Sequence, residues 1–215
     1  MVVSSSYNSR RSTAFAREAS VKKSSDAALL VIDVQKGLDN PRLGPRNNPH
    51  AEQRIAELLA AWRGTGRPVI HVQHMSTEPQ SLLRPGLPGN AIKYEALPIA
   101  GEPVFQKNVN SAFIGTDLES YLRSKGIESL VMVGLTTEHC ISSSARMAAN
   151  LGFNVTVIAD ATATFGRRGY DGTQYSADVI HGAELASLNG EFATIRNASE
   201  VLAEAREPLP VRSGP

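Results

Sequence analysis

Short β-branched runs alternate with helical patterns along this chain from Ala27 onward, and this alternation limits the fold more than any other feature. Strands separated by helices pair in parallel, and a parallel sheet needs helices on both of its faces. The runs are short and almost free of charge, as buried strands are; they are Ala28–Asp33, Pro68–Gln73, Val104–Gln106, Ser129–Val133, Val155–Ala159 and Phe192–Ile195. The sequence therefore predicts an α/β protein with a three-layer α/β/α doubly wound, Rossmann-like fold and a six-stranded, mostly parallel sheet.

Helical patterns fill the intervals between these strands. Gly126 and Gly152 end two of them, because glycine readily takes the left-handed conformation that follows a helix. The predicted helices are His50–Gly64, Asp117–Lys125, one that starts near His139, Ser176–Leu188 and Ser199–Ala205. The long segment Ser76–Gly101 is rich in proline and glycine, so we expect a functional loop that overhangs the site.

The chain length favours one domain with two differing ends. A chain of 215 residues with 41% hydrophobic content suits a single α/β domain, which we place at residues 26–208. Residues 1–25 are serine-rich with five basic side chains and one acid, which indicates a flexible or subunit-clasping arm, with an organellar transit peptide as the alternative. Residues 209–215 are expected to form a C-terminal tail.

Charge and cysteine content exclude several classes of protein. The 22 basic and 21 acidic residues nearly balance, so nothing indicates a nucleic-acid or anionic membrane partner. No apolar run approaches the ~20 residues that span a bilayer. A single cysteine cannot form an internal disulfide, and a reducing, cytoplasmic location is the expectation.

Three reactive side chains follow predicted strands. Asp33 ends the first strand, Lys107 follows the third and Cys140 follows the fourth, so all should meet at the carboxyl edge of the sheet. Helix N–H groups and the Lys107 ammonium would stabilise a Cys140 thiolate, while Asp33 could exchange its proton. The alternatives are a buried apolar cysteine, a capping aspartate and a surface lysine, and position alone does not decide between them.

The joint pattern resembles the isochorismatase-like cysteine hydrolase superfamily across Ala27 to about Ala205. The segments that carry the resemblance are LLVIDVQKGL, FQKNVNSAF and VGLTTEHCISSSARMAANLGFNVTVIADA. By this resemblance Asp33, Lys107 and Cys140 match the catalytic triad. It also implies a cis peptide between Leu135 and Thr136, with the amides of Thr136 and Cys140 as oxyanion-hole donors.

The resemblance implies a hydrolase that cleaves a C–N bond of a small molecule. An amide, ureido or carbamoyl substrate would acylate Cys140 and form a thioester, and the reaction needs no cofactor. Relatives that hydrolyse isochorismate, a vinyl ether, do not need the cysteine, so its presence points to an amidohydrolase. An ether hydrolase and a noncatalytic binding or assembly protein stay open. A flavodoxin-like nucleotide binder is disfavoured, because neither G-x-G-x-x-G nor a P-loop occurs.

The resemblance further implies a homo-oligomer, a dimer or a tetramer, assembled through helices and the basic arm. One departure from the family pattern is Leu38, where many members have phenylalanine. Another concerns the metal of the nicotinamidase branch, for which Asp39, His71 and His74 are the nearest candidates. Because His71 and His74 lie three apart on a strand, they should face opposite ways, and we predict no metal site.

Polar and aromatic side chains near the predicted strand ends are candidates for substrate contacts. The residues expected to touch substrate are Gln35, Phe113, Thr137 and His74. Weaker candidates are Asn108, Phe165, Tyr170 and Tyr175. Arg167 and Arg168 are interpreted as a solvated turn.

Overall fold

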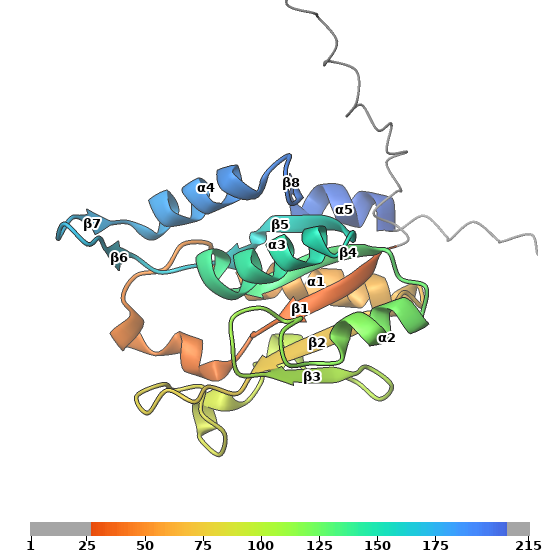
Figure 1. The fold of residues 1–215 in the computed structure, drawn as a ribbon, viewed down its shortest axis with the longest axis horizontal. Helices are drawn as coiled ribbons and strands as arrows, with labels where there is room; N and C mark the ends of the chain where they lie inside the picture. Colours follow the sequence, from red (N-terminus) through yellow and green to blue (C-terminus); the bar gives the residue numbers. More distant parts are fainter. Residues whose placement is uncertain (1–26, 206–215) are drawn as a thin grey trace, which may run out of the picture.

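One parallel sheet forms the centre of the computed structural model, which describes residues 27–205 (Figure 1). The strand order is β3-β2-β1-β4-β5-β8, and every neighbouring pair is parallel. The strands are β1 (Ala28–Ile32), β2 (Val69–His74), β3 (Val104–Lys107), β4 (Ser129–Leu135), β5 (Asn154–Ala163) and β8 (Thr194–Arg196). This confirms the predicted α/β fold and its six-stranded sheet, which is entirely parallel.

Helices cover both faces of the sheet, as the uncharged strands require (Figure 1). The strand β1 shows why: Leu30 packs in the cluster on one face and Leu29 in the cluster on the other, with both fully buried. One cluster takes side chains from α2 (Leu118–Ser124), α3 (Ser142–Asn150) and α4 (Ala177–Leu188). The opposite cluster takes them from α1 (Ala51–Gly64) and α5 (Ala198–Ala205).

The predicted elements match the observed ones closely, with two differences. The helix expected near His139 starts with a π-helical turn, η6 (Thr137–Ile141), before α3 begins. A two-stranded antiparallel hairpin, β6 (Arg167–Arg168) with β7 (Gln174–Tyr175), was not predicted. Its strands are too short to show an alternating pattern, so only the turn residues between them could have signalled it.

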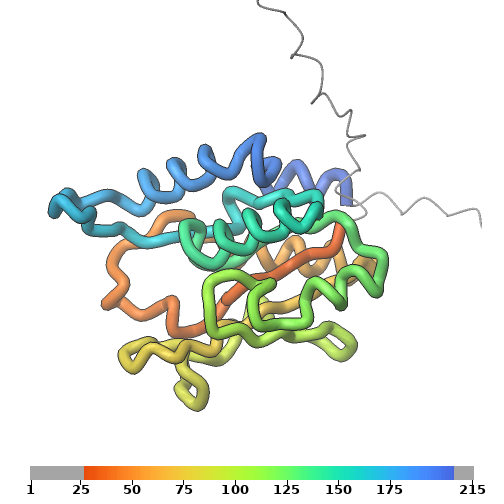
Figure 2. Tube along the Cα trace, viewed as in Figure 1, coloured from red at the N-terminus to blue at the C-terminus, as the bar shows by residue number. Residues whose placement is uncertain are grey.

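The strand order reverses direction between β1 and β4, which makes the carboxyl ends of these two strands the expected ligand site. Two irregular segments gather at that end: the one after β1, coloured orange, and the one after β2, coloured yellow (Figure 2). They contain the 3-10 turns η2 (Lys36–Asp39), η3 (Pro41–Leu43), η4 (Pro88–Asn90) and η5 (Tyr94–Ala96). These segments can therefore wall a pocket over the sheet edge.

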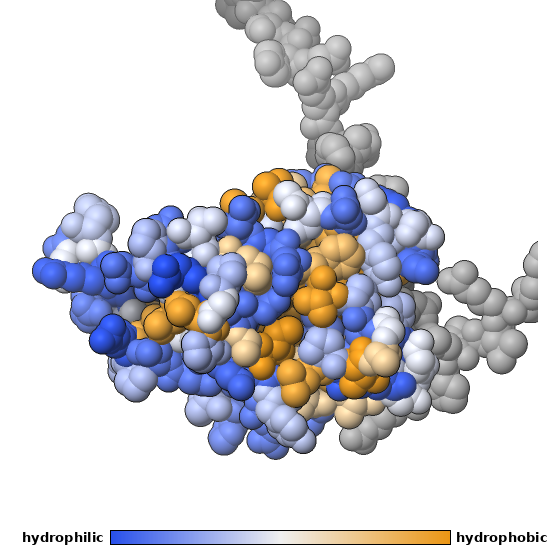
Figure 3. Space-filling view, turned by 90° about the horizontal axis from the view of Figure 1, so that it is seen from below, coloured by the Kyte–Doolittle hydropathy of each residue, from blue (hydrophilic) through white to orange (hydrophobic). Residues whose placement is uncertain are grey.

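Among residues 27–205, no helix is long and apolar enough to cross a membrane. Figure 3 shows a face of the molecule on which apolar side chains gather among hydrophilic ones. Exposed apolar side chains near the edge strand β3 include Val104, Val109 and Ile114. The predicted arm 1–25 and tail 209–215 lie outside the described residues, and the domain boundaries stay predictions.

Candidate active site

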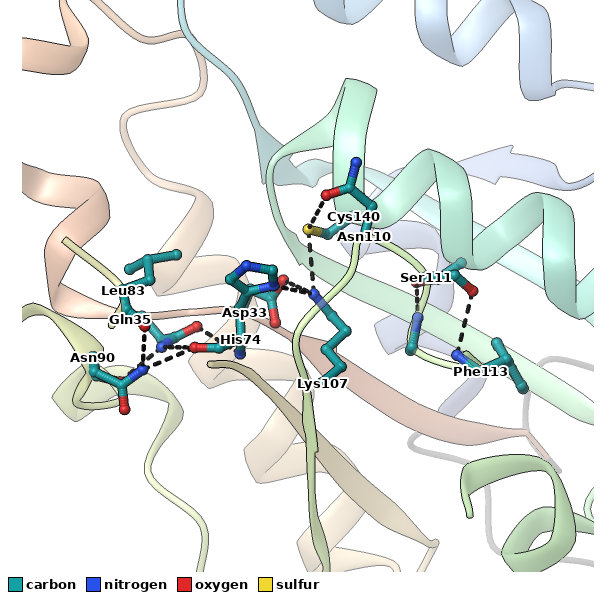
Figure 4. Close-up of polar contacts among 12 residues, drawn as sticks. Asp33, Gln35, His74, Leu83, Asn90, Lys107, Asn110, Ser111, Phe113 and Cys140 are labelled. Carbon is teal, nitrogen blue, oxygen red and sulfur yellow. Dashed lines mark hydrogen bonds and ion pairs between the residues drawn. The ribbon is translucent and has the colours of Figure 1, made fainter. Parts of the chain in front are cut away.

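The structure brings Asp33, Lys107 and Cys140 together at the carboxyl edge of the sheet (Figure 4). Lys107, the last residue of β3, donates from Nζ to Oδ2 of Asp33 at 2.5 Å and to Sγ of Cys140 at 3.3 Å. Asp33 directly follows β1 and Cys140 lies in η6, so three strands supply the group. The side chains of Asp33 and Lys107 are at most 1% exposed. An ammonium thus lies between a carboxylate and a thiol, away from water.

A close approach of two strands places the thiol next to the carboxylate. Gly134 of β4 has φ 128, and a Cβ there would lie 1.9 Å from the carbonyl oxygen of Ile32 in β1. Only glycine fits this position, because any side chain would push β4 away from the end of β1. The peptide between Leu135 and Thr136 is cis, as the resemblance implies, and η6 follows immediately.

The surroundings of the Cys140 sulfur favour the thiol over the thiolate in the resting state. Burial and the neighbouring Asp33 raise the pKa of Cys140, and Lys107 opposes them without prevailing. Burial also raises the pKa of Asp33 against the attraction of Lys107. A carboxylate with a raised pKa is a better proton acceptor than an ordinary one. The arrangement can therefore move the proton from sulfur to Asp33 when the sulfur attacks.

One oxygen of Asp33 is free to take that proton. Within the described residues Oδ1 is buried and has no hydrogen-bond partner, while Oδ2 accepts from Lys107. Ligand atoms of Asp33 and Cys140 lie within 4.8 Å of each other. The thiol also makes a long contact of 3.9 Å with Oδ1 of Asn110, a residue that the sequence reasoning did not single out. Asn110 lies within the FQKNVNSAF segment, which was the available signal.

His74 lines the pocket and also contacts the lysine. Its Nδ1 lies 3.1 Å from Nζ of Lys107, so the ring nitrogen accepts and the three ammonium hydrogens face Asp33, His74 and Cys140. Burial and the Lys107 charge lower the pKa of His74. A neutral imidazole therefore holds the ammonium in place.

Gln35, an expected substrate contact, lies outside the residues that line the pocket. Its amide is fully buried and donates to the carbonyls of His74 at 3.0 Å and Asn90 at 2.8 Å, while the amide N–H of His74 donates to its Oε1 at 2.9 Å. Asn90 in turn donates to the carbonyl of Leu83 at 2.6 Å. The Gln35 amide therefore ties the segment after β2 to the strand edge (Figure 4).

Thr137 and Phe113, also expected to contact substrate, lie outside the residues that line the pocket. Thr137 is fully buried, and its Oγ1 lies 2.9 Å from Nδ1 of His181 on α4, which anchors the start of η6. Phe113 packs in the core with its ring centroid 5.9 Å from that of Phe153, and Figure 4 shows it apart from Cys140. Both side chains are therefore engaged in contacts within the fold, Thr137 with His181 and Phe113 with Phe153.

The three candidate metal ligands are not brought together. Asp39 bonds to Lys93 at 2.5 Å, and His71 Nε2 lies 2.8 Å from Glu102. A different donor set, Asp33, His74 and Cys140, has ligand atoms within 4.8 Å of one another. This set does not fit a metal ion, because the Lys107 ammonium already bonds to each member and would repel a second cation.

A cavity of about 260 Å³ opens onto Cys140. Apolar residues supply much of its wall, and Ser81 and Leu83 come from the segment predicted to overhang the site, which confirms that expectation. Phe165 lines it too, but Asn108, Tyr170 and Tyr175 do not. The residues that line the cavity are Asp33, Leu38, Leu43, His74, Ser81, Leu83, Asn110, Leu135, Thr136, His139, Cys140, Phe165 and Arg167.

Arg167 belongs to the cavity rim, although its sequence context indicated a solvated turn. Its Nε and one terminal nitrogen donate to Oε1 of Glu138 at 3.0 and 2.6 Å, and Thr164 donates to the other oxygen at 2.5 Å. Burial alone would raise the pKa of Glu138, but the hydrogen bonds from Thr164 and Arg167 lower it. The rim therefore holds the ionised Glu138 carboxylate paired with the Arg167 guanidinium.

Comparison with known proteins gives a consistent result. The isochorismatase domain family matches residues 27–200. The chain is 46% identical to the isochorismatase family protein YrdC of Bacillus subtilis over 81% of this chain and 94% of that protein. It is 30% identical to the ureidoacrylate amidohydrolase of Rhizobium rhizogenes over 84% of this chain and 71% of that protein. A crystal structure of an isochorismatase-family protein from Chromobacterium violaceum superposes with TM-score 0.82 at 45% identity, over 84% of this chain and 94% of that one.

Proposed function

The chain belongs to the isochorismatase family of hydrolases, and on that premise we propose that it hydrolyses a C–N bond in a small amide, ureido or carbamoyl compound. The observation that carries this proposal is the position of the Lys107 ammonium, bonded to both the Asp33 carboxylate and the Cys140 sulfur beside the cavity. A nucleophile with an adjacent base and a fixed cation is the arrangement that acyl transfer requires. The amidohydrolase activity in the name of the Rhizobium rhizogenes relative adds support.

In the first half-reaction, Sγ of Cys140 attacks the carbonyl carbon and its proton passes to the unpaired Oδ1 of Asp33. The carbonyl oxygen becomes an oxyanion, for which the amides of Thr136 and Cys140 are the proposed donors; both residues line the cavity. Asp33 then gives its proton to the nitrogen as the C–N bond breaks. Ammonia or an amine leaves, and a thioester remains on Cys140.

In the second half-reaction, Asp33 takes a proton from water, and the hydroxyl oxygen bonds to the thioester carbon. The tetrahedral intermediate collapses with cleavage of the C–S bond, and the proton on Asp33 returns to sulfur. A carboxylic acid leaves and the thiol is restored. Lys107 keeps its proton throughout and stabilises whichever of its two neighbours carries negative charge.

A substrate panel tests this proposal. Ammonia or amine release would be followed with small amides, ureas and carbamoyl compounds, for the wild-type protein and for Cys140→Ala, Asp33→Asn and the exposed control Lys125→Met. We expect turnover by wild type and Lys125→Met only. Cleavage of a vinyl ether that persists in Cys140→Ala would instead support ether hydrolysis. Binding without turnover of any compound would favour the noncatalytic binding or assembly protein.

We further propose that the protein assembles as a homo-oligomer in a reducing compartment such as the cytoplasm. The exposed apolar side chains near β3 support assembly, and the single free cysteine, which the mechanism needs as a thiol, supports the compartment. Light scattering of the purified full-length chain tests the first point. A monomeric mass at micromolar concentration would contradict it.

A further inference from the structure

Apolar side chains form much of the wall of the Cys140 cavity. Leu38 and Leu43 come from the segment after β1, Leu83 from the segment after β2, and Phe165 from the segment after β5. The three leucines are only partly buried by the protein, so their apolar surface remains available to a ligand. Covering such surface is favourable for an apolar group and costly for a charged one.

The charges that border the cavity cancel in pairs. Asp33 is paired with Lys107 at 2.5 Å, and Glu138 is paired with Arg167 at 2.6 Å. The lowered pKa of Glu138 keeps that acid ionised, so Arg167 has no uncompensated charge. The remaining polar lining is Ser81, Asn110, Thr136, His74 and His139. An ionic group on the substrate would lose water without meeting a free opposite charge.

From this lining, and resting on the proposed function, we infer that the substrates are uncharged amides with a short apolar acyl chain. The amide carbon lies at Cys140 and the chain extends along Leu38, Leu43 and Leu83. At ~30 Å³ for each water-sized volume, the cavity of about 260 Å³ holds roughly eight or nine non-hydrogen atoms.

A matched pair of substrates tests the inference. 4-Methylpentanamide and succinamate have nearly the same shape, but the isopropyl group of the first is a carboxylate in the second. We expect kcat/KM to favour 4-methylpentanamide by at least about tenfold, because a buried carboxylate without a partner is strongly rejected. 4-Aminobutanamide, which carries a cation at the same end, is expected to be as poor as succinamate.

Three variants connect this preference to named side chains. Leu83→Asn is nearly isosteric and is expected to reduce kcat/KM for 4-methylpentanamide several-fold more than kcat/KM for acetamide, whose acyl chain is a single methyl group. The control is Leu97→Asn in the same segment, since Leu97 is 45% exposed and does not line the cavity. Glu138→Gln frees the charge of Arg167 and is expected to shift the ratio of the two kcat/KM values several-fold toward succinamate.

The outcomes distinguish failure of the inferred substrate preference from failure of the proposed amide hydrolysis. A wild-type preference for succinamate that disappears in Arg167→Gln would overturn the inference and make Arg167 a carboxylate anchor, while amide hydrolysis itself would stand. Equal rates on all three compounds would also overturn it. If none of the amides, acetamide included, acylates Cys140 in a mass spectrum, the proposed function fails and the inference fails with it.

Discussion

Replacing Lys107 with methionine should destabilise the protein strongly, because it leaves the Asp33 carboxylate buried and unpaired. The Nζ–Oδ2 distance is 2.5 Å, and the two side chains are 0% and 1% exposed. Removing one member of a buried ion pair costs about 3–5 kcal/mol. For a domain of this size each kcal/mol lowers the melting temperature by about 2–4 °C, so we expect a decrease of roughly 6–20 °C at pH 7.

The double variant Lys107→Met/Asp33→Asn should recover much of that loss, because no buried charge remains to be stabilised. The two single effects should therefore fail to add, with a coupling of at least ~2 kcal/mol. In Lys107→Met alone, the pKa of Asp33 rises further above its unfolded value, so the folded protein binds the proton more readily. Its deficit relative to wild type should shrink as the pH falls from 7 toward 4.

Thermal unfolding followed by circular dichroism at pH 7 and pH 5 measures these effects. Lys36→Met is the control, because Lys36 is exposed and its ammonium has no partner within the described residues. A Lys107→Met variant that melts within about 2 °C of wild type at pH 7, or single effects that add, would show that Asp33 and Lys107 do not form a coupled buried ion pair.

Three further predictions concern residues around the site. His74→Leu should lose most of kcat with little change in KM, because the Lys107 ammonium loses its third hydrogen-bond acceptor. His74→Asn keeps an acceptor and should recover activity. Wild type should lose activity at acidic pH as His74 protonates, and His74→Asn should not show that loss. Gln35→Leu should lower the unfolding free energy by about 1–3 kcal/mol in denaturant titration, because the buried N–H of His74 loses its acceptor. Hydrogen bonds from Arg46 and Lys93 hold the pKa of Glu52 at about 2 despite its burial. Glu52 should therefore stabilise the fold at neutral pH and stop doing so as the pH falls from about 4.5 toward 2. Glu52→Gln should lower the free energy of unfolding by about 1–3 kcal/mol at pH 7 and by almost nothing at pH 2.

The central strands were predictable because they are buried on both faces: every residue of β1 and β4 is buried, whereas the edge strands β3 and β8 are largely exposed or half-buried. The run Ala28–Ile32 is short, apolar and free of charge, which favours a central strand, and in the structure its residues alternate between the two core clusters. The β6–β7 hairpin has two residues in each strand, which is a single period of alternation and too short to form a pattern. Such an element depends on its turn and on contacts that only the folded chain supplies.

The positions of Asp33, Lys107 and Cys140 were predictable because strand topology fixes where a residue at the end of a parallel strand lies. The roles of their neighbours were not. Gln35 follows Asp33 by two residues and looks equally suited to a ligand, yet its amide is used up by the backbone of His74 and Asn90. The rise in the pKa of Cys140 could not be predicted either, because a sequence reveals the nearby lysine but not the depth of burial.

Acid-quenched mass spectrometry tests the central claim most directly. The wild-type protein would be mixed with 4-methylpentanamide, quenched within the first turnover and digested for peptide mapping. We predict one acyl group, bound to Cys140 through a thioester that hydroxylamine removes, and little or none in Asp33→Asn quenched at the same time. Product that forms without any acyl group on Cys140, and that still forms in Cys140→Ala, would contradict the account.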